Sequence, residues 1–278
     1  MTHYETRLMK AQDGTQLFAH AWLPPRGPEK VLFIAHGIGE HAGRYDHLAR
    51  ALNEDKIAVF ALDHRGHGRS AGLRAYFDDF GQPVRDLRQF WEETAMHYGG
   101  NPMHLYGHSM GSIIALMFAL QYPHFLSGLI LTGTATTVEE TQPTALIQVS
   151  LLIGSILPKL RSVQRIDIST LSTDLNTQRA YKADPLNDGK AIRFGMARGI
   201  ILNGRAILQR AEELRLPLLI MHGADDKLTP PSGSQAVYDR VGSEDKTLRI
   251  WPGMRHELIN EVDRQAVIQA MRDWLMKH

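Results

Sequence analysis

The segment HLYGHSMGSIIALMFALQY, residues 104–122, joins a short apolar run to a helix-length stretch that is apolar on almost every face. Its pentapeptide Gly107-His-Ser-Met-Gly111 fits the pattern Gly-x-Ser-x-Gly. Between a strand and a helix both glycines have a steric function, because the turn is too tight for a Cβ and directs the serine outward. A helix that is apolar all round lies in a core, and apolar strands beside it predict a parallel sheet covered on both faces.

Further strands and helices alternate on both sides of this segment. We predict strands at residues 17–22, 31–35, 57–62, 104–107, 129–132, 216–222 and 247–251. We predict helices at about 44–53, 84–98, 111–122, 234–241 and 262–277. The alternation predicts an α/β fold with a doubly wound, mostly parallel sheet.

One stretch departs from the alternation. Residues 134–213 contain helical fragments and no convincing strand. We therefore expect a helical cap at 134–213, inserted between a first core part at 1–133 and a second core part at 214–278. Insertions of this kind lie above the carboxyl edge of the sheet, where ligands bind.

The composition excludes several classes of protein. The chain has 278 residues, of which 43% are hydrophobic and 22% charged, so global disorder is excluded. A formal net charge of +1, without a run of like charges, disfavours a nucleic-acid partner. The absence of cysteine excludes disulfides, thiolate metal sites and a cysteine nucleophile.

The sequence also bears on location. In MTHYETRLMK, residues 1–10, Glu5 and Arg7 stand where a signal peptide needs its apolar stretch. No stretch of about 20 apolar residues is uninterrupted, which disfavours a membrane-spanning helix. We expect a cytoplasmic protein, and the sequence leaves its oligomeric state open.

The central serine, Ser109, is a candidate nucleophile. A serine hydroxyl needs a histidine to take its proton and a carboxylate to orient that histidine. In this topology the acid and then the histidine follow on loops after later strands. His256 follows the strand that ends at Trp251, and both Asp225 and Asp226 follow the strand at 216–222, so the acid is one of these two.

Acyl transfer also needs N–H donors for the developing oxyanion, one of them from the residue after the nucleophile. That residue is Met110. The loop HGIGEH, residues 36–41, follows the strand at 31–35, and its glycines allow a close approach of the backbone, which makes Ile38 the second candidate. The alternative is that these glycines only turn the chain.

Two other readings of the histidine-rich loops are disfavoured. His36, Glu40 and His41 do not match the spacing of helical zinc motifs, and the intervening glycines argue against a helix, so we expect no metal. The segment DHRGHG, residues 63–68, lacks the Gly-Lys-Ser/Thr ending of a phosphate-binding loop, and we interpret it as structural.

Taken together, these residues resemble the monoacylglycerol lipase and lysophospholipase branch of the α/β-hydrolase superfamily, which is also grouped with the serine aminopeptidases. The matching motifs follow one another in family order over nearly the whole chain. They are His36-Gly-Ile-Gly-Glu-His-Ala-Gly-Arg-Tyr45, Asp63-His-Arg-Gly-His-Gly-Arg-Ser70, Gly107-His-Ser-Met-Gly111, Tyr181-Lys-Ala-Asp-Pro-Leu186, Gly223-Ala-Asp-Asp226 and Gly253-Met-Arg-His256. The first motif is the most specific to this branch.

The resemblance implies an eight-stranded sheet with a helical cap, and it implies roles for single residues. Ser109 would be the nucleophile, His256 the base and Asp226 the acid, because the Gly-x-x-Asp motif ends on residue 226. Ile38 and Met110 would form the oxyanion hole. Glu40, Arg44 and Tyr181 would order the polar end of a monoglyceride, although Glu40 and Arg44 could equally form a structural ion pair.

The expected activity is hydrolysis of a single-chain lipid ester, most of all a monoacylglycerol, without a cofactor. The alternatives are a lysophospholipase or short-chain carboxylesterase with the same triad, and a catalytically silent ligand receptor. Within the cap, residues 146–157 are rich in apolar residues and carry no charge. They either pack inward as core or form an apolar rim that makes a peripheral membrane contact.

Overall fold

The computed structural model describes residues 2–162 and 165–278, and it is built around one sheet. The eight strands are β1 (His3–Lys10), β2 (Gln16–Leu23), β3 (Lys30–Ala35), β4 (Ile57–Leu62), β5 (Met103–His108), β6 (Gly128–Thr132), β7 (Leu218–Gly223) and β8 (Lys246–Trp251). Their order across the sheet is β1-β2-β4-β3-β5-β6-β7-β8. Only β2 runs antiparallel to its neighbours, β1 and β4, so the expected mostly parallel sheet is confirmed.

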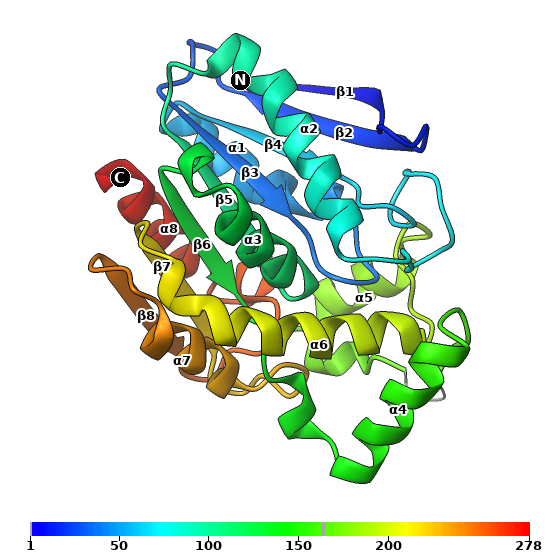
Figure 1. The fold of residues 1–278 in the computed structure, drawn as a ribbon. Coiled ribbons are helices and arrows are strands. Elements are labelled where there is room, and N and C mark those ends of the chain that lie inside the picture. The colour runs from blue at the N-terminus through cyan, green and yellow to red at the C-terminus, as the bar shows by residue number, and fades with distance from the viewer. Residues whose placement is uncertain (1, 163–164) are drawn as a thin grey trace.

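Helices cover both faces of the sheet (Figure 1). The α-helices are α1 (Asp46–Glu54), α2 (Gly81–Tyr98), α3 (Met110–Gln121), α4 (Thr144–Ile156), α5 (Leu175–Ala183), α6 (Phe194–Arg210), α7 (Pro231–Arg240) and α8 (Arg264–Lys277). Short 3₁₀ helices lie at Ala42–Tyr45, Pro123–Phe125, Val138–Thr141, Ile168–Thr170, Ala211–Glu213 and Leu258–Asn260. Helices α1 and α8 pack on one face, and α2, α3, α6 and α7 on the other.

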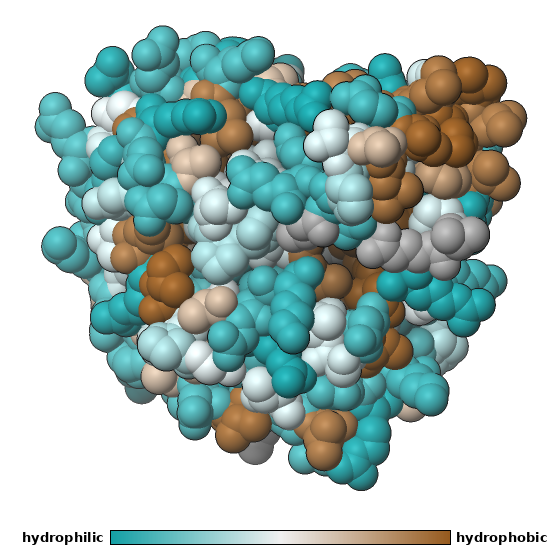
Figure 2. All heavy atoms as spheres, turned by 90° about the horizontal axis from the view of Figure 1, so that it is seen from below, coloured by the Kyte–Doolittle hydropathy of each residue, from teal (hydrophilic) through white to brown (hydrophobic). Residues whose placement is uncertain are grey.

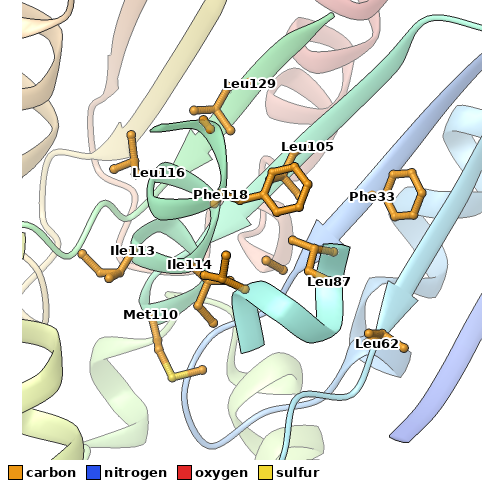
Figure 3. Packing of buried hydrophobic residues seen from close by; sticks show 14 of the residues in the cluster. Phe33, Leu62, Leu87, Leu105, Met110, Ile113, Ile114, Leu116, Phe118 and Leu129 are labelled. Carbon is orange, nitrogen blue, oxygen red and sulfur yellow. The ribbon is translucent and has the colours of Figure 1, made fainter. Parts of the chain in front are cut away.

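The larger core lies between the sheet and the helices α2 and α3. Figure 3 shows Ile113 and Ile114 of α3 and Leu87 of α2 in this cluster, together with Phe33 of β3. All residues of α3 from Met110 to Leu116 are buried, which agrees with the apolar character of this helix on nearly every face. The core therefore holds the start of α3 rigidly at the carboxyl end of β5.

The strand and helix predictions are confirmed within about three residues, with one omission. Strand β1 was not expected, because almost all of its side chains are exposed and its sequence carries no apolar alternation. It pairs with β2 in an antiparallel register that joins His3 to Leu23 and Lys10 to Gln16. An edge strand of this kind is set by backbone pairing with its neighbour rather than by burial.

The segment between β6 and β7 contains α4, α5 and α6, and Figure 1 shows all three gathered at the end of the sheet to which the arrows of β3 and β6 point. Within its described part the only pairing of strand type is an isolated bridge between Arg161 and Arg193. Helix α4 packs on α6, where a Cβ at Gly154 would come within 2.6 Å of the Phe194 carbonyl oxygen. The exact limits of the cap, 134–213, stay a prediction.

No helix in the described part of the chain has both the length and the apolar character needed to cross a bilayer.

The turn between β5 and α3 is packed without spare room. A Cβ at Gly111 would lie 1.9 Å from the carbonyl oxygen of Ala35 on β3, and a Cβ at Gly107 would lie 2.5 Å from the carbonyl oxygen of Gly111. Both contacts are with backbone, which cannot move aside without shifting a strand or a helix. The glycines of the pentapeptide are therefore required by the packing of α3 onto β3.

We predict that Gly111→Ala lowers the free energy of unfolding by about 2–3 kcal/mol, because the added methyl group overpacks this contact. Urea unfolding followed by circular dichroism measures the change. Gly27→Ala is the matched control, since no atom lies within 4 Å of a Cβ at the exposed Gly27, and it should change stability by less than about 0.5 kcal/mol. Equal effects of the two substitutions would contradict the prediction.

Candidate active site

Ser109 lies at the sharp turn from β5 into α3. Its backbone has φ 54° and ψ −121°, a left-handed conformation that residues with a Cβ seldom adopt. The N–H of Ser109 donates to the Thr132 carbonyl oxygen at 3.0 Å, which ties the turn to the end of β6. The residue is 8% exposed, and it lines a cavity beneath the cap. The expected outward turn of the serine is thus present, in a strained backbone held by its surroundings.

His256 and Asp226 meet at the same end of the sheet, from the loops that follow β8 and β7. The Nδ1 of His256 lies 2.7 Å from Oδ2 of Asp226. His256 lines the cavity together with Ser109. His256 and Asp226 are each less than a tenth exposed. The side chain of the adjacent Asp225 is exposed. The structure therefore places Asp226, and not Asp225, against the imidazole.

Asp226 is held by more donors than the sequence suggested. Its Oδ1 accepts the backbone N–H groups of Leu228 at 2.8 Å and Thr229 at 3.1 Å. Its Oδ2 also accepts from Nε2 of His222 at 3.0 Å, and the Thr229 hydroxyl lies 2.9 Å away. His222 was missed in the sequence, where the only signal was a histidine at the end of a buried strand, four residues before the acid.

Asp226 and His256 each stabilise the charged form of the other. Burial would raise the pKa of Asp226, but the neighbouring imidazoles of His256 and His222 outweigh it and lower that pKa far below the usual range. Burial would lower the pKa of His256, but the Asp226 carboxylate outweighs it and raises the pKa above 6.5. A neutral His256 can therefore accept a proton readily, and its cationic form is stabilised by a fixed carboxylate.

Ile38 and Met110 both line the cavity beside Ser109. Met110 is the first residue of α3, where a backbone N–H has no partner within the helix. Within the described residues neither the N–H of Ile38 nor that of Met110 has a hydrogen-bond acceptor. Two residues from separate elements that line the cavity with the serine therefore each carry an N–H donor that is unpaired within the described part of the chain.

Glu40 and Arg44 form part of a buried network of three charges. Arg44 donates to Oε2 of Glu40 at 2.8 Å and to both carboxylate oxygens of Glu257, at 2.7 Å and 2.6 Å. Burial would raise the pKa of Glu257, but Arg44 lowers it to about 2. Glu257 was not singled out in the sequence, where an acid beside a histidine carries no signal for a partner 213 positions away.

Tyr181, which lies in the cap, contacts this network. The Arg44 guanidinium lies 4.9 Å from the centre of the Tyr181 ring, and the Tyr181 hydroxyl donates to the Gly39 carbonyl oxygen at 2.9 Å. Glu40, Tyr181 and Glu257 line the cavity, whereas Arg44 lies behind them. The three residues expected at the polar end of a substrate are therefore gathered beside the cavity, with two of them at its wall.

The cavity has a volume of about 480 Å³ and extends from Ser109 beneath α4 and α6. Away from the charged network its wall is mainly apolar. The apolar lining includes Ala135, Val138, Leu146, Ile147, Leu160, Ile166, Leu171, Ile192, Phe194, Ile200, Ile201 and Leu228. The cationic residues Arg161, Arg165 and Lys227 also line the cavity, but most of its wall is apolar and suits an alkyl chain.

Among the residues that the structure describes, no three histidine, aspartate or glutamate side chains are arranged to hold a metal ion. His36, His64 and His67 do cluster, with the rings of His36 and His64 4.2 Å apart. Burial lowers the pKa of His64 to about 3 and also lowers the pKa values of His36 and His67, which disfavours positive charge on this cluster.

Comparison with known proteins identifies the family of this chain. The model of the family described as serine aminopeptidase, S33, matches residues 26–263. The monoacylglycerol lipase of Mycolicibacterium smegmatis is 36% identical over 265 residues, which cover 95% of this chain and 94% of that protein. The monoglyceride lipase of Homo sapiens is 36% identical over 269 residues, which cover 95% of this chain and 88% of that protein.

A solved structure extends the comparison to the fold. The monoacylglycerol lipase of Paleococcus ferrophilus superposes with a TM-score of 0.85 and 26% identity, covering 94% of this chain and 99% of that one. Since the family model and the relatives span nearly the whole chain, the resemblance found in the motifs is confirmed. The chain belongs to the serine aminopeptidase S33 family of α/β-hydrolases, in the branch that contains the monoacylglycerol lipases.

Proposed function

We propose that this protein is a serine hydrolase that cleaves monoacylglycerols into fatty acid and glycerol. The observation that carries the proposal is that His256, held 2.7 Å from the buried Asp226, lines the same mainly apolar cavity as Ser109. Relatives named as monoacylglycerol lipases, at 36% identity over almost the whole chain, support the choice of substrate.

The reaction follows from the roles that we assign to these side chains. The Ser109 hydroxyl oxygen attacks the ester carbonyl carbon while Nε2 of His256 takes the hydroxyl proton. The N–H groups of Ile38 and Met110 donate to the resulting oxyanion. His256 then passes its proton to the leaving glycerol oxygen, the C–O bond breaks, and a water molecule releases the fatty acid from Ser109 by the same route.

Asp226 remains ionised throughout. It holds Nδ1 of His256 protonated, so that Nε2 is the free acceptor, and it stabilises the imidazolium that forms. His222 and the two backbone donors keep the carboxylate in place while this charge appears.

We assign contact with the hydroxyl groups of the glycerol moiety to Glu40 and Tyr181, because both line the cavity and both contact Arg44. Both Glu40 oxygens already accept hydrogen bonds. Oε2 accepts from Arg44, and Oε1 accepts from the Gly37 N–H at 2.6 Å and from the Tyr45 hydroxyl at 2.8 Å. Each carboxylate oxygen has two lone pairs, so Oε1 is fully used, whereas Oε2 accepts only from Arg44 and can take a glycerol hydroxyl without breaking these bonds.

The cap provides the surface for a peripheral membrane contact. Figure 2 shows an apolar patch at the corner of the molecule that α4 occupies. Its exposed residues are Leu146, Val149, Leu152, Ile156, Leu157 and Leu160, with exposed fractions between 43% and 67%. In α4 only Ile147 and Gly154 are buried, so packing into the core does not explain this stretch. A patch of this kind can rest on a lipid surface beside the opening through which a substrate enters.

Ser109→Ala should lower kcat for a monoacylglycerol by about 10⁴-fold or more, because no other group can form the acyl-enzyme. Release of fatty acid from monoacylglycerols, lysophospholipids and short-chain esters, measured side by side, tests both nucleophile and substrate. We expect the monoacylglycerol to give the highest kcat/KM. A preference for lysophospholipid would replace the proposed substrate, and an unaltered rate in the Ser109 variant would refute the mechanism.

Asp226→Asn should lower kcat/KM by about 10³–10⁴-fold at neutral pH, because the carboxylate that orients and stabilises His256 is lost. The wild-type pH profile should lose activity as pH falls through a value above 6.5, since the pKa of His256 is raised and its protonated form cannot accept the serine proton. In the variant this acidic limb should move to lower pH. Asp225→Asn is the control and should alter kcat/KM by less than about twofold. A larger loss of kcat/KM in Asp225→Asn than in Asp226→Asn would exclude Asp226 as the acid.

The double substitution Leu152→Ser and Ile156→Ser should weaken binding to phosphatidylcholine vesicles in a flotation assay, because it removes apolar surface from the patch on α4. Hydrolysis of a dissolved short-chain ester should be unaffected. Leu8→Ser is the matched control, because Leu8 is also exposed, at 61%, but lies on the edge strand β1 and outside the cap. Equal flotation of the two variants would count against a membrane contact through α4.

A further inference from the structure

The backbone of Gly37, in the loop after β3, is fixed at both of its polar groups. Its N–H donates to Oε1 of Glu40 at 2.6 Å, and its carbonyl oxygen lies 2.8 Å from Nδ1 of the preceding His36. A Cβ at Gly37 would come within 3.3 Å of the Ser109 side chain. Two hydrogen bonds therefore fix the loop after β3 at the point where it passes Ser109.

The protonation of His36 follows from its second partner. The backbone N–H of His64 lies 2.9 Å from Nε2 of His36, and a backbone N–H can only donate. The Nε2 atom is therefore an acceptor without a proton, and the single proton of the neutral ring is on Nδ1. Complete burial, together with the neighbouring His64 and His67, holds the pKa of His36 well below 6.5, which keeps the ring in this neutral form.

The orientation of one peptide plane connects His36 to the reaction. The Gly37 carbonyl and the Ile38 N–H belong to the same planar trans peptide and point in opposite directions. Holding the carbonyl oxygen toward His36 therefore turns the Ile38 N–H away from it. Ile38 lines the cavity beside Ser109, and within the described residues its N–H has no acceptor.

The loop at residues 63–70 provides the fixed point for this arrangement. The Asp63 carboxylate accepts the N–H of Arg69 at 2.8 Å and the N–H of Ala42 at 2.9 Å, and the Ser70 hydroxyl donates to the Asp63 carbonyl oxygen at 2.5 Å. Gly68, at φ 51°, passes so close to Asp63 that a Cβ would lie 2.1 Å from Oδ2. The His64 N–H is thereby held in place at the start of a rigid loop.

We propose that His36 is a positioning residue for the oxyanion hole. Its Nδ1–H holds the Gly37 carbonyl so that the Ile38 N–H faces the developing oxyanion, and the loop at 63–70 selects the tautomer that makes this possible. The inference rests on the proposed function, and it gives the Asp63–Ser70 motif a part in the reaction beyond shaping a loop.

Two substitutions separate the two hydrogen bonds of His36. In His36→Asn the side-chain amide takes the place of Nδ1 and can still donate to Gly37. In His36→Gln the amide reaches the place of Nε2, where it can accept from His64 but leaves the Gly37 carbonyl without its donor. We expect His36→Gln to lower kcat about 100-fold with little change in KM, as for loss of one oxyanion donor, and His36→Asn to recover most of the loss.

A boronic acid that adds to Ser109 gives a readout independent of turnover, because its tetrahedral adduct puts an oxygen where the oxyanion forms. Its affinity should fall in His36→Gln by the same factor as kcat/KM, and should recover in His36→Asn. Equal losses in both variants, or an unchanged affinity for the boronic acid in His36→Gln, would overturn the proposal. Ser109→Ala remains inactive in either case, so failure here is distinct from failure of the proposed function.

A measurement on the unaltered protein covers the case in which a variant does not fold. Nitrogen-15 NMR of the histidine rings should show His36 as the neutral tautomer protonated on Nδ1 from about pH 5 to about pH 8, the range in which an unperturbed histidine titrates. A ring protonated on Nε2, or one that titrates in this range, would overturn the proposal.

Discussion

The contact between the first turn of α3 and the end of β3 is the constraint on which the site depends. At Gly111 the helix backbone comes so close to the carbonyl groups of Ala35 and His36 that no Cβ fits between them. Two residues earlier, Ser109 has a left-handed backbone conformation, which costs of order 1–3 kcal/mol and is held by an α3 that is buried on nearly all faces. The same contact places the loop at 36–41 beside the serine, so the proposed nucleophile and the proposed oxyanion donors are positioned by one packing interaction.

Around this contact the polar groups of the site are buried and matched. Asp226 accepts two backbone donors and two imidazoles, and Arg44 is shared between Glu40 and Glu257. A buried carboxylate without such donors would be strongly destabilising. With them, the charged side chains are held in fixed positions before a substrate binds, and such preorganisation is what electrostatic stabilisation of a transition state requires.

The cap differs from one end to the other. Its part near residues 171–188 is hydrogen-bonded to the loops of the site, through Leu171 to the Glu257 N–H at 2.7 Å, and through the Asp188 N–H and the Tyr181 hydroxyl to Gly39 at 2.9 Å each. Its other part, α4, presents exposed leucine, isoleucine and valine side chains. The wall of the cavity near Tyr181 is therefore joined to the core, while α4 presents its apolar side chains to the outside.

The sequence by itself determined the α/β architecture, the strand–turn–helix at Ser109 and the position of His256 on a late loop. These features depend on hydrophobic periodicity and on glycines, which are properties of short segments. Strand β1 carried no such signal, because it is an exposed edge whose order comes from pairing with β2.

The local pattern left Asp225 and Asp226 open, and only the resemblance to a family favoured Asp226. The tertiary structure buries Asp226 against His256 and leaves Asp225 exposed, a difference that two neighbours on one loop do not reveal in sequence. It also decided that Arg44 is held by Glu257, 213 positions away, and that His36 is tied to His64, because contacts between distant segments are set by how the elements pack. Local sequence carries the propensity of each element, whereas the distances between their side chains exist only once the sheet and its helices have assembled.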